Sequence, residues 1–315
     1  MTAASAEISS APGFSRLVMI DGPVGKADWP ETRAREACRN LEAGNIVYLP
    51  ATPIEIPVED RELLLGRKQS SAAYHKNIAY RPLEDRVTGL DSSEAQEGER
   101  LRCILHDYSQ SSVQFLRTFL APYAEKWKLE FASFRPIEEK GRPARVHARN
   151  DLLHFDSFPT RPTNGARILR FFTNINPSQN RVWLTSQTFE AFGPRMVRAG
   201  GLTAPLENPL LRGVNSLARA LRLRKANSSP YDDLMHRCHN SMKEDSNFQE
   251  TTPKHRWEFP PNSSWMVFTD CVSHAVLSGQ YALEQTFLIP QAALVEPQRS
   301  PLAILESLTG RRLSV

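Results

Sequence analysis

The chain has 315 residues, of which 40% are apolar and 23% are charged, and its formal net charge at pH 7 is +4. This balance is typical of a globular protein with a buried core, and it argues against a disordered or fibrous chain. The small positive excess suits an anionic small molecule or a membrane surface better than a nucleic-acid backbone, so we expect no nucleic-acid partner.

Two further features narrow the class of protein. No apolar run reaches the roughly 18 residues that cross a bilayer, and the N-terminal region lacks the pattern of a secretory signal. The four cysteines are scattered, with neither the spacing of a zinc site nor that of a disulfide framework. We therefore expect a cytoplasmic protein with reduced, structural cysteines.

The N-terminal part predicts a loose tail over residues 1–27 that contains a short edge strand at Leu17–Ile20. One domain is expected over 28–315. It begins with an amphipathic helix over Asp28–Leu41, because an aspartate suits the helix start and a proline suits the first turn. Gly44 is expected to end this helix.

The next elements are a helix around Val113–Tyr123, where apolar residues recur at helical spacing, and a set of short strands. Loops rich in Pro, Gly and Asn separate the strands, which is the pattern of a jelly roll or β-barrel. The strands are predicted at Ile46–Leu49, Phe131–Pro136, Arg145–His147, Ile168–Ile175, Trp265–Thr269 and Ala282–Ile289. We therefore predict the α+β class, with a jelly-roll (cupin-like) core and flanking helices.

Polar and basic stretches between the strands predict a helical insertion over about 186–250. It contains expected helices over Pro209–Lys225 and Tyr231–Glu244. The first carries a leucine-rich stripe bordered by arginines, which is typical of a helix lying on an anionic membrane, although packing on the barrel explains it equally well. A short C-terminal helix is predicted over Pro301–Leu308.

The candidate chemistry lies in a His-x-Asp triplet, His154 and Asp156, at the end of a predicted strand. Residues i and i+2 of a strand point to the same side, so the imidazole and the carboxylate face a common point. His274 directly follows another predicted strand and can supply a third ligand, which completes the two-histidine, one-carboxylate set of non-heme Fe(II) oxygenases. The alternative is a hydrogen-bonded structural pair with an unrelated strand histidine.

A second histidine pair, His236 and His239, lies three residues apart on a polar predicted helix. Side chains at this spacing are neighbours and could chelate a metal ion. No third ligand of matching quality lies near them in the sequence. We therefore interpret them as part of a solvated helix face.

Two long segments, His154–Asn176 and Trp265–Phe287, strongly resemble the Kdo hydroxylases of Gram-negative bacteria. The resemblance extends more loosely over Tyr74–Tyr80 and Tyr231–Lys243. It implies a double-stranded β-helix fold and an Fe(II)/2-oxoglutarate-dependent dioxygenase that uses O2, with ascorbate as a possible aid. The implied substrate is 3-deoxy-D-manno-oct-2-ulosonic acid (Kdo) in Kdo-lipid A of lipopolysaccharide, hydroxylated at C3 to give D-glycero-D-talo-oct-2-ulosonic acid.

One departure from the wider superfamily concerns the distal carboxylate of 2-oxoglutarate. Many relatives bind it with a cation about ten residues after the second histidine, yet residues 275–298 contain no basic residue. An arginine elsewhere should replace it, because a guanidinium binds a carboxylate in a bidentate manner. Arg167 and Arg170 are the candidates, on opposite faces of one strand, and we choose Arg170. Gln285 and Thr286 are expected to add hydrogen bonds.

The acidic sugar and its neighbouring phosphates require cations, for which the sequence offers one set of candidates. They are Arg67, Lys68, His75, Lys76, His147 and Arg149. A solvated charged surface explains them equally well. Contact with the inner membrane and self-association remain open, as do two other functions: an oxygenase acting on another small metabolite, and a non-catalytic cupin-like metal-binding protein.

Overall fold

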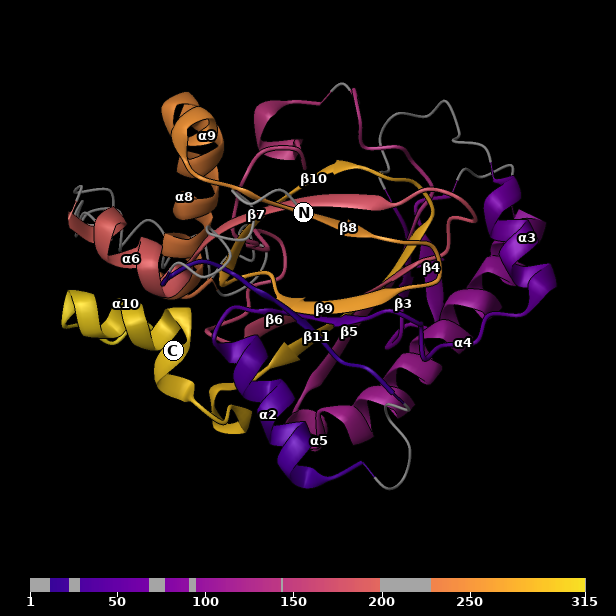
Figure 1. Cartoon of the computed structure of the whole chain (residues 1–315), viewed down its shortest axis with the longest axis horizontal. Coiled ribbons are helices and arrows are strands. Elements are labelled where there is room, and N and C mark those ends of the chain that lie inside the picture. Colours follow the sequence, from indigo (N-terminus) through magenta and orange to yellow (C-terminus); the bar gives the residue numbers. More distant parts are fainter. Residues whose placement is uncertain are drawn as a thin grey trace, which may run out of the picture.

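The computed structural model describes residues 12–22, 29–67, 77–90, 95–142, 144–198 and 228–314. Two facing β-sheets form its centre (Figure 1). The large sheet contains β1 (Leu17–Met19), β2 (Ile46–Leu49), β9 (Ser264–Phe268), β6 (Arg167–Asn174), β11 (Ala282–Ile289), β5 (Lys128–Arg135), β3 (Ile78–Arg81) and β4 (Arg86–Thr88), in this order. The small sheet has the order β10 (Val272–Ser278), β7 (Arg181–Thr188), β8 (His255–Phe259).

From β6 onward the chain crosses repeatedly between the two sheets, with β6, β9 and β11 in the large sheet and β7, β8 and β10 in the small one, which is how a jelly roll is wound. Strands β6 and β11 pair antiparallel along their whole length at the centre of the large sheet. Along β6, Phe171 contacts Phe115 on the helical side, whereas Arg170 and Phe172 line a cavity between the sheets. The predicted α+β class with a jelly-roll core is thus confirmed.

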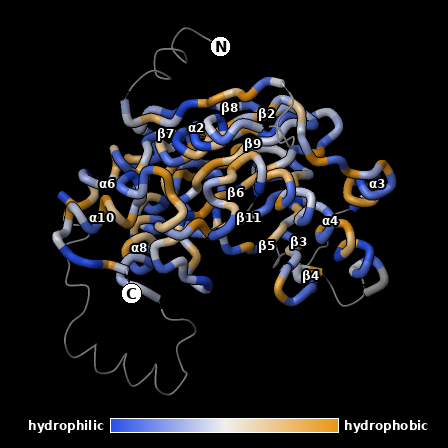
Figure 2. The backbone as a smooth tube through the Cα atoms, turned by 90° about the horizontal axis from the view of Figure 1, so that it is seen from below, coloured by the Kyte–Doolittle hydropathy of each residue, from blue (hydrophilic) through white to orange (hydrophobic). Residues whose placement is uncertain are grey.

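Helices α2 (Glu31–Glu42), α4 (Ala95–Phe119) and α5 (Ala121–Ala124) cover the outer face of the large sheet, below it in Figure 1. Helix α2 buries one face that includes Ala34, Cys38 and Leu41, as its apolar spacing predicts. Hydrophobic residues run along central strands such as β6 and β9, and the peripheral loops are largely hydrophilic (Figure 2). None of the helices in the described ranges is long and apolar enough to span a bilayer.

A second group of helices lies beside the sheets: α6 (Phe189–Arg198), α8 (Pro230–Glu244), α9 (Ser246–Thr251) and α10 (Pro301–Thr309) (Figure 1). Helix α3 (Val58–Gly66) lies at the opposite side. Three short 3-10 turns, η2 (Val146–Ala148), η3 (Gln291–Ala293) and η4 (Pro297–Arg299), complete the elements. At the C-terminal end of α10, Gly310 adopts a left-handed conformation, which suits glycine because it has no Cβ.

Several predicted elements differ from the structure. Residues 186–188 belong to strand β7, so the helical region begins with α6 and not at 186. Arg145–His147, predicted as a strand, falls largely within the turn η2. Strands β3, β4, β7, β8 and β10 were not predicted, because β3 and β4 are only three or four residues long and the other three contain polar residues. The predicted helix Pro209–Lys225 lies outside the described residues.

Candidate metal centre

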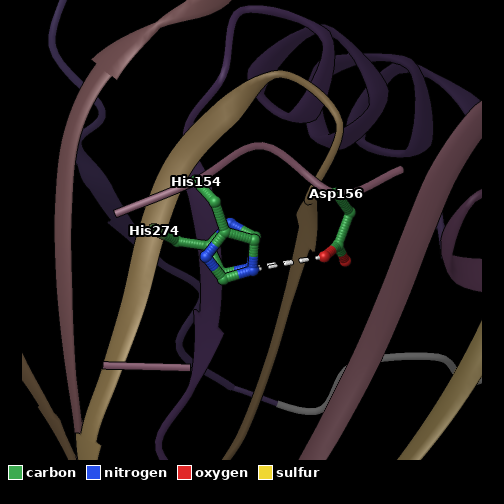
Figure 3. Close-up of side chains that lie close together, drawn as sticks. All are labelled: His154, Asp156 and His274. Atoms are coloured by element: carbon green, nitrogen blue, oxygen red, sulfur yellow. Dashed lines mark ion pairs between the residues drawn. The ribbon is translucent and has the colours of Figure 1, made fainter. Parts of the chain in front are cut away.

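His154 and His274 are direct neighbours across an antiparallel bridge, although they are far apart in the sequence (Figure 3). The N–H of His154 donates to the carbonyl of His274 at 3.1 Å, and the reverse bond measures 3.0 Å. The N–H of Asp156 donates to the carbonyl of Thr269 at 2.8 Å. The short segment that carries the triplet is therefore extended backbone that joins β10 through one isolated antiparallel bridge.

Phe155 fixes which way this segment faces. Its ring is fully buried and packs edge-on against Phe189 and Phe192 of α6, with ring centroids 5.2 and 5.4 Å away. Because side chains alternate along a strand, His154 and Asp156 then point together into the cavity between the sheets.

The three side chains converge closely enough to share one metal ion. One ligand atom from each lies within 4.8 Å of the others. Oδ1 of Asp156 is 3.5 Å from Nε2 of His154 and 4.0 Å from Nε2 of His274. Each imidazole places Nδ1 against a backbone carbonyl, Leu152 at 2.8 Å and Val272 at 2.9 Å. A carbonyl only accepts, so Nδ1 carries the proton and the lone pair of Nε2 faces the centre.

The protonation states also suit metal binding. Burial lowers the pKa of His154 to about 3 and also lowers the pKa of His274, so both rings are neutral at neutral pH. Burial acts to raise the pKa of Asp156, but Arg170, His154 and His274 together outweigh it and hold this pKa well below its usual range. Two neutral imidazoles and one carboxylate fit a divalent iron with positions left open for co-substrate and oxygen.

Arg170 lies inside the cavity, as predicted, but it is already engaged by carboxylates. Its Nη2 is 2.9 Å from Oδ2 of Asp156, in an ion pair outside hydrogen-bond geometry, and its Nη1 donates to Glu284 at 2.7 Å. Glu284 also accepts from Nε of Arg135 at 2.8 Å and from the hydroxyl of Thr286 at 3.1 Å. Thr286, the other predicted contact on this face, thus lines the cavity within the same network.

Arg181 is the cavity arginine that lacks a carboxylate partner among the described residues. Its side chain is 1% exposed, and Nη1 donates to the carbonyl of Gly279 at 3.0 Å, while Nε and Nη2 have no hydrogen-bond partner. Burial lowers its pKa to about 10. It lies two positions before Trp183, whose ring stacks on His274 with centroids 5.3 Å apart. A buried cation in this state favours an anion from outside the chain.

Two residues predicted to bind the co-substrate do not line the cavity. Arg167 is fully buried on the opposite face of β6, where it pairs with Asp270 at 2.8 Å and stacks over Phe268. Gln285 occupies the opposite face of β11 and donates to the backbone carbonyl of Glu130 at 3.0 Å. The expectation that either side chain contacts 2-oxoglutarate does not fit this placement, because strand alternation turns both away.

The residues predicted to bind substrate are also not gathered at the cavity. The described members each pair with a nearby acidic residue: Arg67 with Glu97, His147 with Glu244 and Arg149 with Asp151. None of these three lines the cavity. Lys68, His75 and Lys76 lie outside the described residues.

The interpretation of His236 and His239 as a solvated face is wrong for His239. Its ring lies edge-on to His154 with centroids 4.9 Å apart, and its Nδ1 is 2.8 Å from the carbonyl of Phe155. His236 instead contacts Asn240 on its own helix at 3.3 Å. Helical spacing alone could not reveal which face of α8 packs on the strand.

The cavity measures about 250 Å³ and is rich in charge, with four arginines and two carboxylates among its lining residues. Sequence analysis missed Arg135, Arg161, Arg181 and Glu284 from this set. Glu284 could have been found, because it shares a strand face with the predicted Thr286. The arginines carry no local signal, since each comes from a different strand or loop.

Comparison with known proteins agrees with this geometry. Residues 25–312 match the family model described as 3-deoxy-D-manno-oct-2-ulosonic acid (Kdo) hydroxylase. The apo structure of the Kdo hydroxylase KdoO, a non-heme Fe(II) α-ketoglutarate-dependent dioxygenase, is 31% identical with a TM-score of 0.82, covering 95% of this chain and 97% of that one. The structure of KdoO with α-ketoglutarate and Fe(III) is 30% identical in sequence, with a TM-score of 0.82, and the structure with cobalt(II) is 31% identical, with a TM-score of 0.83. Both cover the same shares of the two chains. No curated protein sequence matches the chain.

Proposed function

The chain belongs to the Kdo hydroxylase family, and we propose that it is an Fe(II)- and 2-oxoglutarate-dependent dioxygenase that hydroxylates C3 of Kdo in Kdo-lipid A. The observation that carries this proposal is the buried cluster of His154, Asp156 and His274 in an arginine-rich cavity. These three residues would hold the iron. When bound, iron and 2-oxoglutarate supply the oxidising chemistry, in which O2 is consumed, 2-oxoglutarate becomes succinate and CO2, and one oxygen enters a C–H bond.

Arg181 replaces Arg170 as the proposed partner of the distal carboxylate of 2-oxoglutarate. Arg181 has two N–H-bearing nitrogens without partners, whereas Arg170 is held between Asp156 and Glu284. The carboxylate would neutralise a cation that the described chain leaves without a counter-ion. A buried pair of this kind also fixes the direction in which the co-substrate enters the centre.

Arg170 is proposed to orient a metal ligand instead. Because its guanidinium holds Oδ2 of Asp156, only Oδ1 remains directed at the two histidines. Such partners of ligating groups typically contribute about 10- to 100-fold in metal affinity. We expect Arg170→Met to weaken Co(II) affinity by about tenfold or more, measured by titration of the apo protein. Arg161→Met is the control, since Arg161 lines the same cavity but pairs with Glu130; equal losses in both variants would contradict the assignment.

The sugar acid is proposed to meet Arg161. This side chain is half-buried, lines the cavity and lies over the rings of Phe131 and Phe158, with its guanidinium carbon 4.2 and 4.4 Å from their centroids. Aromatic rings beside a cation suit a sugar ring that carries a carboxylate, because they offer apolar faces next to a charge partner.

The test is incubation with Fe(II), ascorbate, 2-oxoglutarate and Kdo-lipid A, followed by mass spectrometry. We expect the lipid-linked sugar to gain one oxygen, with one succinate released for each product. Succinate release with no gain on Kdo-lipid A would indicate an oxygenase with a different substrate. Iron binding with neither outcome would indicate a non-catalytic metal-binding protein.

Peripheral contact with the inner membrane remains a prediction of this function. A lipid-linked substrate requires the cavity to approach a membrane surface, and the basic stripe of 209–225 is the sequence feature that suits it. That stretch lies outside the described residues, and self-association likewise stays open.

A further inference from the structure

The extended segment that carries His154 and Asp156 has two edges, and the backbone groups on each edge form hydrogen bonds with a different part of the protein. On one edge, His154 exchanges hydrogen bonds with His274, and Asp156 donates to Thr269. Since successive residues of a strand point their backbone groups to opposite edges, the groups of Leu153 and Phe155 face the other way. No neighbouring strand lies on that second edge within the described chain.

Side chains of the helical pair α8–α9 take the place of that missing strand. Gln249 of α9 accepts from the N–H of Leu153 at 2.9 Å and donates to the carbonyl of the same residue at 2.9 Å. Its amide also donates to the carbonyl of Met242 at 2.8 Å, which ties it to the end of α8. One glutamine therefore satisfies both backbone groups of Leu153, as a paired strand residue would.

His239 of α8 bonds the second residue on this edge. Its Nδ1 lies 2.8 Å from the carbonyl of Phe155, and because a carbonyl only accepts, Nδ1 donates. Phe155 is the residue between His154 and Asp156. The ring of His239 also packs against the ring of His154, at 4.9 Å between centroids.

We propose that Gln249 and His239 are positioning residues that hold the metal-binding segment from its free edge, so that α8–α9 sets the geometry of the metal centre. The inference rests on the proposed metal centre, since it concerns how two of its ligands are kept in place. Backbone groups that are buried without partners are costly, so loss of these contacts lets the segment move or admit water. A facial ligand set tolerates little displacement, because its affinity depends on all three donors converging.

The test measures Co(II) affinity of the apo protein by absorption titration, with urea unfolding of each apo variant measured in parallel. His239→Asn keeps an amide N–H near the position of Nδ1, whereas His239→Gln places its amide near Nε2. We expect the Asn variant to bind Co(II) within about threefold of wild type and the Gln variant to bind at least about tenfold more weakly. His236→Gln alters a ring that stacks on His239, with centroids 6.3 Å apart, but that has no hydrogen bond to the segment, so this variant should bind within about threefold of wild type.

Gln249→Met tests the second contact, with the exposed neighbour Glu250→Met as its control. We expect weaker Co(II) binding only for Gln249→Met, by at least about tenfold. Equal affinity of the Asn and Gln variants at 239, or wild-type affinity of Gln249→Met, would overturn the inference. A purely structural role would lower the unfolding free energy of the apo variants and leave Co(II) affinity unchanged, which also overturns it. Absence of Co(II) uptake by the wild-type protein would instead contradict the metal centre.

Discussion

Alanine at His154, Asp156 or His274 is expected to abolish hydroxylation and to weaken Fe(II) affinity by at least about 100-fold. Each residue supplies one of the three donor atoms that converge within 4.8 Å. A two-ligand site cannot hold iron while three positions serve co-substrate and oxygen. Succinate release and iron content after dialysis measure the two effects.

These variants should still fold. Each histidine variant loses one side-chain hydrogen bond, and Asp156→Ala loses an ion pair with Arg170, which Glu284 still partners. We therefore expect the unfolding free energy of the apo protein to change by no more than about 1–2 kcal/mol. His236→Ala is the control and should retain activity, because the His236 side chain bonds Asn240 on its own helix and has no contact with the three proposed ligands. Near wild-type turnover of any triad variant at low iron concentration would show that the ligand set is misassigned.

Arg181→Leu is expected to raise the 2-oxoglutarate requirement by at least about tenfold, which corresponds to about 1.4 kcal/mol. The physical reason is the buried guanidinium whose Nε and Nη2 lack partners, since removing it leaves the dicarboxylate without its proposed charge partner inside the protein. Iron affinity should remain near that of wild type, because Arg181 has no contact with the three ligands. The 2-oxoglutarate requirement is measured from the rate of succinate formation at increasing 2-oxoglutarate concentration, and the iron affinity is measured by Fe(II) titration.

Two comparisons make the assignment specific to Arg181. Arg181→Lys should recover part of the loss, since it keeps the charge but not the two-pronged geometry. Arg161→Leu should leave the 2-oxoglutarate requirement unchanged, because Arg161 pairs with Glu130. If Arg170→Met raises this requirement with iron affinity intact, and Arg181→Leu does not, then the original choice of Arg170 was correct.

The sequence by itself determined which way side chains point along a strand and where some of the strands lie. Alternation along a strand predicted that His154 and Asp156 face one way, and the structure places both side chains in the cavity. The same rule separated Arg167 from Arg170 on β6, and the two do lie on opposite faces. The central strand Ala282–Ile289 was predicted at its observed bounds, between the Ser278–Gly279 turn and Pro290, although three polar residues interrupt its apolar ones.

Only the tertiary structure decided which charged and polar side chains contact one another. Arg181 was not singled out because β7 itself was not predicted, and the structure buries it against the closely approaching Gly279. Arg170 was expected to be free for the co-substrate, yet Glu284, from a strand more than 100 residues later, holds it beside Asp156. His239 was judged solvated because its helix is polar, although that helix packs on the strand that carries His154. Periodicity fixes the direction of a side chain relative to its own strand or helix, whereas its partners depend on the long-range pairing that brings distant strands and helices together.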